Sequence, residues 1–272
     1  MRRDRSTFDW RRWRLRAGPR APEPTVDPYF AFDREELAAR GRRMRDRFLS
    51  ADPFPHAVLD EFFPQAVARR LAEEFPSPES FLDESAAGED RRRGKFSSTP
   101  QTPLPGFVRH VLYHLNSATV IGFLQELSGI APLLPDPDVT RALRHFGPGG
   151  RLGLHADPSY HGGLGLDRRL NLLVYLTPDW QPEWQGALEL WDEELEACRS
   201  SIEPRFNRCV VFLATDRTFH GFPRPLACGP GITRRSMQLY YYTAGRPDGE
   251  VEGRHGTLFL GEGPGGPFRP PG

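Results

Sequence analysis

Apolar positions follow a helical repeat in the first half of the chain. Their spacing predicts four helices, over Asp33–Leu49, Pro64–Phe75, Gly106–Leu115 and Ser117–Leu127. Proline opens the second of these, and Ser117 is placed to cap the fourth, because both residue types favour the start of a helix. The first half is therefore predicted to be mainly helical.

Beyond residue 136 the pattern changes to short β-branched and aromatic runs. They predict six strands, over Val139–Phe146, Leu152–Ala156, Leu170–Leu176, Ala187–Trp191, Cys209–Ala214 and Ser236–Thr243. Gly- and Pro-rich turns such as Gly147–Gly150 separate these runs. Short strands without amphipathic helices between them favour a mainly β fold with α-helices: a double-stranded β-helix, or cupin-like jelly roll, with an N-terminal helical layer.

These patterns divide the chain into four regions. Residues 1–25 are rich in arginine and lack a sustained apolar repeat, which predicts a disordered basic arm. Residues 26–135 should form a helical support that includes a long loop or lid at 77–103, since that stretch has no apolar pattern. Residues 136–245 should form the jelly roll, and residues 246–272 a Gly/Pro-rich tail.

Composition narrows the classes of function. Acidic and basic residues balance at 36 each, so no overall field favours nucleic acid or an anionic membrane as a partner. The three cysteines show no CxxC spacing, and no apolar run is long enough to cross a membrane. We therefore expect a reduced, cytoplasmic protein; its oligomeric state is left open.

A candidate metal site begins at His155, the only one of the eight histidines with an aspartate two positions later. On a strand these two side chains share a face, so His155 and Asp157 can reach one ion. A strand-end histidine beside a turn aspartate would give the same pair, but His220, just after another predicted strand, supplies a third ligand. Two histidines and one carboxylate suit non-haem Fe(II) better than zinc, calcium or magnesium.

A candidate anion site follows at the start of the last predicted strand. Alternation places Arg234 and Ser236 on one face, where a guanidinium and a hydroxyl can hold a carboxylate, while Arg235 points the other way. A buried arginine needs an anion, and the distal carboxylate of 2-oxoglutarate would suit a site whose iron holds the other end. An edge-strand arginine in solvent is the alternative, and either of the adjacent arginines could face inward.

Three segments together resemble a known family. They are Arg168–Trp180, Gly186–Trp191 and Pro204–Arg208, and they look like the catalytic domain of prolyl-4-hydroxylase-like Fe(II)/2-oxoglutarate-dependent oxygenases. The resemblance covers about residues 136–245 and is weaker in the preceding helices. One glycine of the family's pair is replaced by Ala187, and the stretch between the distal histidine and the arginine is long for the family.

The resemblance assigns roles to particular residues. It implies that His155, Asp157 and His220 ligate Fe(II) and are the catalytic centre, and that Arg234 binds the distal carboxylate of 2-oxoglutarate. Tyr175 matches a position that bonds the same carboxylate in some relatives. Asn171 lies four residues before it, so strand alternation directs Asn171 into the same pocket.

The resemblance also implies a reaction. Fe(II), 2-oxoglutarate and O2, with ascorbate as a supporting reductant, would hydroxylate an unactivated C–H bond and release succinate and CO2. The substrate would be an amino-acid side chain in a peptide, protein or carrier-bound intermediate, or a free small molecule. Asp157 favours hydroxylation over halogenation, because halogenating relatives carry a small residue there. Desaturation and ring formation stay open.

Two other classes also fit parts of the sequence. A cupin-type metal-dependent dioxygenase or isomerase that does not use 2-oxoglutarate would keep the three ligands without needing Arg234. A non-catalytic binding module should have damaged ligands, whereas all three are present. Demethylation of nucleic acid is disfavoured by the neutral charge.

Overall fold

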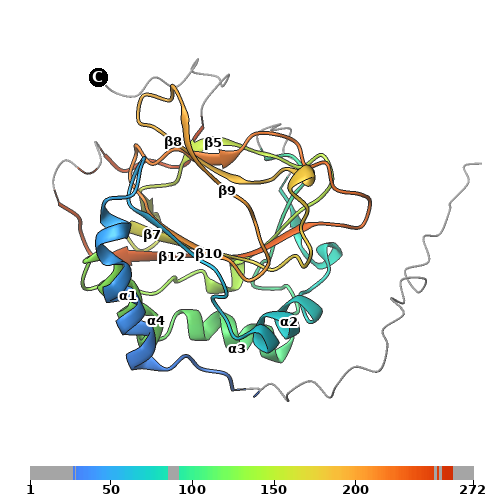
Figure 1. Ribbon diagram of the computed structural model, residues 1–272, viewed down its shortest axis with the longest axis horizontal. Helices are drawn as coiled ribbons and strands as arrows, with labels where there is room; N and C mark the ends of the chain where they lie inside the picture. The colour runs from blue at the N-terminus through green and yellow to red at the C-terminus, as the bar shows by residue number, and fades with distance from the viewer. Residues whose placement is uncertain (1–26, 28, 85–91, 248–249, 251–252, 260–272) are drawn as a thin grey trace, which may run out of the picture.

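Two antiparallel sheets face each other and form a jelly roll, with helices covering the outer face of the larger sheet (Figure 1). This computed structural model describes residues 27, 29–84, 92–247, 250 and 253–259. The predicted basic arm and most of the predicted tail lie outside them. In the described part, no helix has the length and apolarity needed to cross a membrane.

The larger sheet has the strand order β1-β10-β7-β12-β4-β3-β2, with β6 also paired to β7. Its strands are β1 His56–Leu59, β2 Leu82–Asp83, β3 Lys95–Ser97, β4 Leu143–Phe146, β6 Tyr160–His161, β7 Leu166–Tyr175, β10 Cys209–Leu213 and β12 Arg234–Thr243. The smaller sheet has the order β13-β5-β11-β8-β9. Its strands are β5 Leu152–Ala156, β8 Leu188–Trp191, β9 Cys198–Ile202, β11 His220–Phe222 and β13 Leu258–Phe259.

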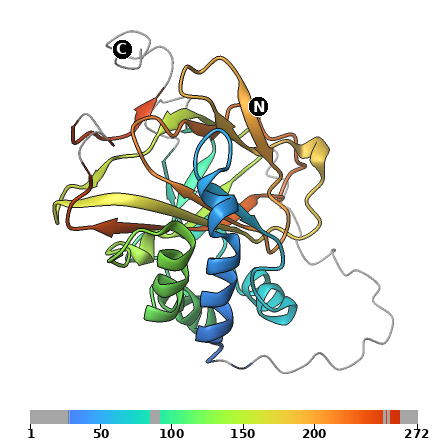
Figure 2. The same ribbon diagram turned by 60° about the vertical axis from the view of Figure 1, so that its left-hand side comes forward.

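The helices lie together on one side of the roll, as Figures 1 and 2 both show. They are α1 Arg34–Leu49, α2 Gln65–Glu73, α3 Gly106–Leu115 and α4 Ala118–Ser128, with short 3-10 turns at Pro78–Ser80, Val139–Arg141 and Pro182–Trp184. Asp33 and Ser117 cap α1 and α4 by accepting hydrogen bonds from the backbone N–H of Glu36 and Val120. The α4 cap was predicted from the sequence.

Alternation along the large sheet separates two environments. On the outer face, residues such as Val174, Met237 and Leu239 pack with the helices in one apolar core. On the inner face, Tyr175 and Phe212 pack against Leu190 of the small sheet. Side chains that alternate with the helix-facing residues of β7 and β12 therefore point into the roll.

The predicted fold class is confirmed. The predicted helices and strands are present, Gly106–Leu115 and Leu152–Ala156 with the predicted ends and the others with shifted ends. Two expectations need correction. Residues 139–141 form a 3-10 turn, so the strand begins only at Leu143. The predicted loop at 77–103, of which residues 85–91 lie outside the described part, contains β2 and β3, which extend the large sheet beyond β4. Strands of two or three residues are too short to show an alternating pattern, and pairing with β4 rather than local sequence defines them.

Candidate metal centre

His155, Asp157 and His220 come together inside the roll. Each offers a ligand atom, and these atoms all lie within 4.8 Å of one another. His155 is the second-to-last residue of β5, and Asp157 follows it by two residues. His220 begins β11, which pairs with β5 so that the two histidines are cross-strand partners. All three side chains are buried. The antiparallel pairing of β5 and β11 therefore gathers the cluster from positions 65 residues apart in sequence.

Hydrogen bonds fix which nitrogen each histidine offers. Nδ1 of His155 lies 2.8 Å from the carbonyl oxygen of Gly153, and Nδ1 of His220 lies 2.9 Å from that of Thr218. A carbonyl oxygen can only accept, so both Nδ1 atoms carry the proton and both Nε2 atoms keep a lone pair. These Nε2 atoms lie 3.5 and 3.6 Å from the two carboxylate oxygens of Asp157. The three groups thus direct unprotonated atoms to one point.

Burial and charge keep His220 and Asp157 in metal-binding protonation states. Burial, followed by the nearby His155, lowers the pKa of His220 to about 4, so its imidazole is neutral near pH 7. Burial alone would raise the pKa of Asp157, but His155, His220 and Arg168 hold it well below its usual value. A neutral imidazole and an ionised carboxylate are the forms that ligate a cation.

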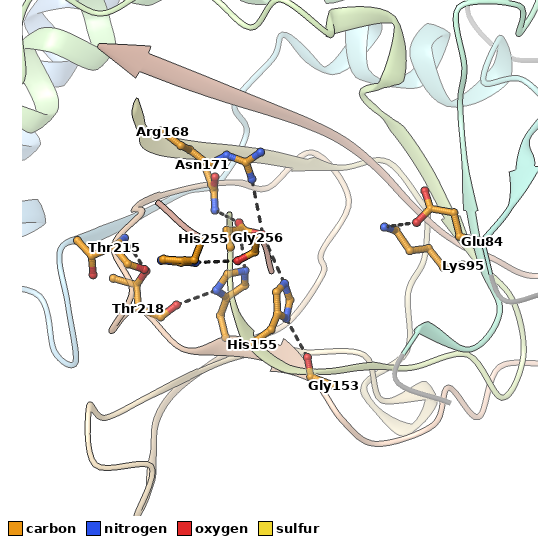
Figure 3. A network of polar contacts seen from close by, with 12 residues as sticks. Glu84, Lys95, Gly153, His155, Arg168, Asn171, Thr215, Thr218, His255 and Gly256 are labelled. Atoms are coloured by element: carbon orange, nitrogen blue, oxygen red, sulfur yellow. Dashed lines mark hydrogen bonds and ion pairs between the residues drawn. The ribbon is translucent and has the colours of Figure 1, made fainter. Parts of the chain in front are cut away.

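Two side chains of β7 support the Asp157 carboxylate; Figure 3 shows these two, Arg168 and Asn171, across from His155. Asn171 donates from Nδ2 to Oδ2 of Asp157 over 2.5 Å. The Arg168 guanidinium lies 3.7 Å from Oδ1 of Asp157 and stacks on the Tyr240 ring with its Cζ 3.7 Å from the centroid. Both side chains therefore orient Asp157. Strand alternation predicted that Asn171 points into the cofactor pocket. No role was predicted for Arg168, although it lies within the segment that resembles the family.

A second polar group lies at Arg234 on β12. Its Nε donates to the carbonyl of Gly186 over 2.8 Å, and its Nη2 donates to the hydroxyl of Tyr175 over 3.2 Å. The rings of Tyr175 and Phe222 flank the guanidinium, with centroids 4.7 and 4.4 Å from its Cζ. Among the described residues, no carboxylate lies within ion-pair distance of Arg234. A guanidinium that is only 3% exposed is thus left ready for an anionic ligand.

Gly186 has a conformation and a position that only glycine fits. Its φ is +79°, and a Cβ there would lie 2.5 Å from a Leu226 methyl and 3.2 Å from Cδ of Arg234. This close approach lets its carbonyl meet the guanidinium. Gly186 is buried, and Ala187, where the family has its other glycine, follows directly and is partly exposed.

The other side chains at this end of β4 and β12 divide between the two faces of the larger sheet. Ser236 is buried and shares the inner face with Arg234. Arg235 points to the helical side, where it donates to the carbonyl of Ala72. His145, on the same outer face, bonds to Thr233 and to the carbonyl of Pro76 and packs among phenylalanines. His145 is therefore a packed core histidine, and Arg234 is the inward arginine of its pair.

An aromatic residue near the end of the described chain, Phe259, lies beside the proposed ligand His155. Strand β13 pairs with β5 and places Phe259 opposite His155, with ring centroids 5.2 Å apart. The guanidinium of Arg92 lies over the Phe259 ring, with its Cζ 5.1 Å from the ring centroid. No sequence pattern predicted this short strand, because Gly- and Pro-rich sequence surrounds it.

The donor set fits one kind of resident metal. Two imidazole nitrogens and one carboxylate on one side of an ion leave its other positions open, which is typical of non-haem Fe(II). A closed tetrahedral zinc site would need a fourth protein ligand, and no other His, Cys, Asp or Glu of the described residues joins the cluster.

Comparison with known proteins agrees with this geometry. Residues 140–242 match the family model of the 2OG-Fe(II) oxygenase superfamily. No curated protein sequence matches the chain significantly. A prolyl hydroxylase from Trichoplax adhaerens, solved with a peptide fragment of a hypoxia-inducible factor, is 16% identical with a TM-score of 0.52, covering 76% of this chain and 91% of its own.

Two further solved structures have the same fold. A prolyl-4-hydroxylase from Pseudomonas putida is 19% identical with a TM-score of 0.51, covering 76% of this chain and 98% of its own. HygX from Streptomyces hygroscopicus, solved with nickel, 2-oxoglutarate and hygromycin B, is 13% identical with a TM-score of 0.51, covering 80% of this chain and 96% of its own. At these identities the structural likeness establishes the fold.

Proposed function

We propose, on the premise that residues 140–242 belong to the 2OG-Fe(II) oxygenase superfamily, that this chain is an Fe(II)- and 2-oxoglutarate-dependent hydroxylase whose iron is held by His155, Asp157 and His220. The observation that carries the assignment is the convergence of these three ligands with both Nε2 atoms unprotonated. The family supplies the cofactor identity, and the cluster supplies the residues.

The chain's own residues prepare the site for two ligands. Bound Fe(II), with O2, couples the decarboxylation of 2-oxoglutarate to succinate and CO2 with hydroxylation of a substrate C–H bond. Asn171 and Arg168 keep the Asp157 carboxylate oriented toward the histidines. Burial of all three ligands excludes bulk water and strengthens their electrostatic contacts.

Arg234 supports the use of 2-oxoglutarate over a cupin-type reaction without it. Arg234 is buried, has no carboxylate partner among the described residues, and is held by Gly186 and Tyr175. A dicarboxylate that reaches from the metal to this guanidinium would satisfy both groups at once. A metal-dependent dioxygenase or isomerase that lacks this co-substrate would have no need to bury an unpaired arginine.

The substrate is proposed to be an amino-acid side chain, in a peptide, bound to a carrier or free. The prolyl hydroxylase from Trichoplax adhaerens was solved with a peptide, and HygX was solved with hygromycin B, so proteins of this fold bind both peptides and small molecules. Proline-containing peptides and free amino acids are the first compounds to test.

Anaerobic reconstitution tests the proposal. The protein is loaded with Fe(II) and 2-oxoglutarate, exposed to O2 with candidate substrates, and analysed for succinate and for products that have gained one oxygen atom. Succinate formation that depends on Fe(II) and 2-oxoglutarate is expected. Oxidation of a substrate without any consumption of 2-oxoglutarate would instead support the cupin-type alternative.

A further inference from the structure

Arg144 on β4 is a buried cation without an anionic partner. Five arginines of the described part are buried: Arg144, Arg168, Arg169, Arg208 and Arg234. Three of these have a carboxylate within ion-pair distance, provided by Asp157, Glu250 and Asp60. Arg234 and Arg144 have none among the described residues. Because burial of an unpaired charge is costly, each of these two guanidinium groups is expected to meet an anion from outside the chain.

The contacts of Arg144 leave its charge uncompensated. Its Nη1 donates to the backbone carbonyls of Arg141 and Leu143. Its Nε is buried and has no hydrogen-bond partner within the described part of the chain. Carbonyl oxygens satisfy individual N–H groups, but they carry no net charge with which to balance the guanidinium.

Arg144 faces the same interior as Arg234. In the pairing of β12 with β4, Arg144 lies opposite Ser236 and Phe146 lies opposite Arg234. Cross-strand partners share a face, so all four point into the roll. Farther along β12, the inward Tyr240 ring carries the stacked Arg168 that contacts Asp157. Arg144 thus belongs to the wall that runs from the proposed 2-oxoglutarate site toward the proposed metal.

The charged neighbours of Arg144 are one lysine and one glutamate, so together with Arg144 the group keeps one excess positive charge. Lys95 on β3 donates to Glu84, which follows β2, over 2.7 Å, and Figure 3 shows the pair on the same side of the view, apart from His155. Burial, followed by Arg144, lowers the pKa of Lys95 to about 8. Burial would raise the pKa of Glu84, but Lys95 and Arg144 hold it below its usual value. One carboxylate therefore lies in the field of two cations and is already bonded to one of them.

The proposed function leaves this cation unmatched. With Asp157 bound to the metal and the distal carboxylate of 2-oxoglutarate on Arg234, neither anion is available to Arg144. We propose that Arg144, with Lys95 beside it, forms a second anion-binding subsite that takes a carboxylate of the hydroxylation substrate. This inference rests on the proposed function and narrows its substrate class to compounds or residues that carry a carboxylate near the reacting carbon.

Binding of matched acids and amides tests the subsite. Protein loaded with Mn(II) and saturated with 2-oxoglutarate is titrated calorimetrically with free L-amino acids and their amides. Capped dipeptides whose only carboxylate is a Glu side chain, with their Gln counterparts, form the second arm. In the wild type, at least one acid should bind roughly ten- to a hundredfold more tightly than its neutral partner. The arm that shows this preference distinguishes a free acid from an acidic residue.

Substitutions at Arg144 test whether this residue causes the preference for acids over amides. Arg144→Gln should bring the ratio of acid to amide affinity close to one, and Arg144→Lys, which keeps the charge but loses the planar fork, should give an intermediate ratio. Arg141→Gln is the matched control, because Arg141 is half exposed and lies three residues earlier. Its ratio should equal that of the wild type. Thermal unfolding of each variant checks that it is folded.

Three outcomes would overturn the subsite. The first is that the wild type binds every acid and its neutral partner with about equal affinity. The second is an unchanged ratio in folded Arg144→Gln and Arg144→Lys. The third is a loss of 2-oxoglutarate affinity in Arg144→Gln with the ratio preserved, which would assign Arg144 to the co-substrate. Failure of the proposed function appears earlier and separately, as an absence of Mn(II)-dependent 2-oxoglutarate binding before any acid is added, and that result would remove both proposals.

Discussion

The amide Nδ2 of Asn171 donates to Oδ2 of Asp157 over 2.5 Å, and this contact joins the centre of β7 to the segment that follows β5. Asn171 lies on the larger sheet, and Asp157 directly follows the last residue of β5 of the smaller sheet. The amide can donate, whereas a carboxylate can only accept, so the bond has a fixed direction and fixes one Asp157 oxygen. The position of the proposed iron ligand therefore depends on how the two sheets are packed.

Removal of this bond should weaken metal binding without removing a ligand. Asn171→Ala is expected to lower Fe(II) affinity roughly ten- to a hundredfold, the usual cost of losing an orienting contact. Asn171→Asp should be worse, because two carboxylates would then face each other. Anaerobic Fe(II) titration of both variants gives the measurement, and equal affinities in the wild type and both variants would show that Asp157 needs no support.

Loss of the carboxylate ligand itself should have a larger effect. Asp157→Ala should reduce Fe(II) affinity more than roughly a hundredfold, because loss of a supporting contact alone costs up to about that much. The variant should also form no succinate. Asp138→Ala is a suitable control, since Asp138 is exposed and pairs with His161 at 3.2 Å outside the cluster. Succinate formation at the wild-type rate in Asp157→Ala would remove the proposed ligand set.

The tandem arginines of β12 offer an internal comparison for the 2-oxoglutarate site. Arg234→Gln should raise the KM for 2-oxoglutarate roughly ten- to a hundredfold, because hydrogen bonds to a charged group contribute about 1.5–3 kcal/mol. Arg235→Gln should leave this KM unchanged, since Arg235 donates to Ala72 on the helical side. If the two variants exchange these effects, Arg235 binds the co-substrate.

Stability at mildly acidic pH should depend on His145. Burial lowers its pKa from 6.5 to about 4, so between these values the unfolded chain binds a proton that the folded chain does not. The contribution of neutral His145 to the free energy of unfolding is therefore complete above pH 6.5. As the pH falls toward 4, the protein loses up to about 3 kcal/mol of this stability.

Urea unfolding of metal-free protein measures this dependence. From pH 7 to pH 5, the wild type should lose more stability than His145→Gln, which has no titrating ring at this position. The variant should already be less stable at pH 7, because Thr233 and the carbonyl of Pro76 lose a buried hydrogen-bonding partner. Parallel pH profiles for the two proteins would show that another group causes the slope.

The sequence predicted the elements whose signals are local. The helix over Arg34–Leu49 has a periodic pattern and a capping aspartate, and the strand Leu152–Ala156 was predicted with its observed ends. Short strands such as Lys95–Ser97 and Leu258–Phe259 depend on pairing partners that are distant in sequence, and so they were missed. Local pattern is informative when one segment alone buries a face, and it fails when pairing supplies the stability.

In the candidate metal centre, the ligands were easier to predict from the sequence than the residues that orient them. His155, Asp157 and His220 were recognisable because few residue types bind metals, and the structure brings them together. The role of Arg168 beside Asp157 depends on a β-bulge. Between Tyr241 and Tyr242 the pairing of β12 with β7 skips one residue, so that Tyr242 lies opposite Arg168 rather than Arg169. Strict alternation from Asn171 would have directed Arg169 inward.

The register of β7 and β12 also limits which changes in chain length the protein can tolerate. Two adjacent arginine pairs, 168–169 and 234–235, are each split between the interior and the outside. Deletion of a single residue within either strand would exchange the members of a pair and keep the composition almost unchanged. Insertions in the connection between Phe222 and Arg234 should be accepted more readily, so natural or engineered variation in length is expected there and not in the paired strands.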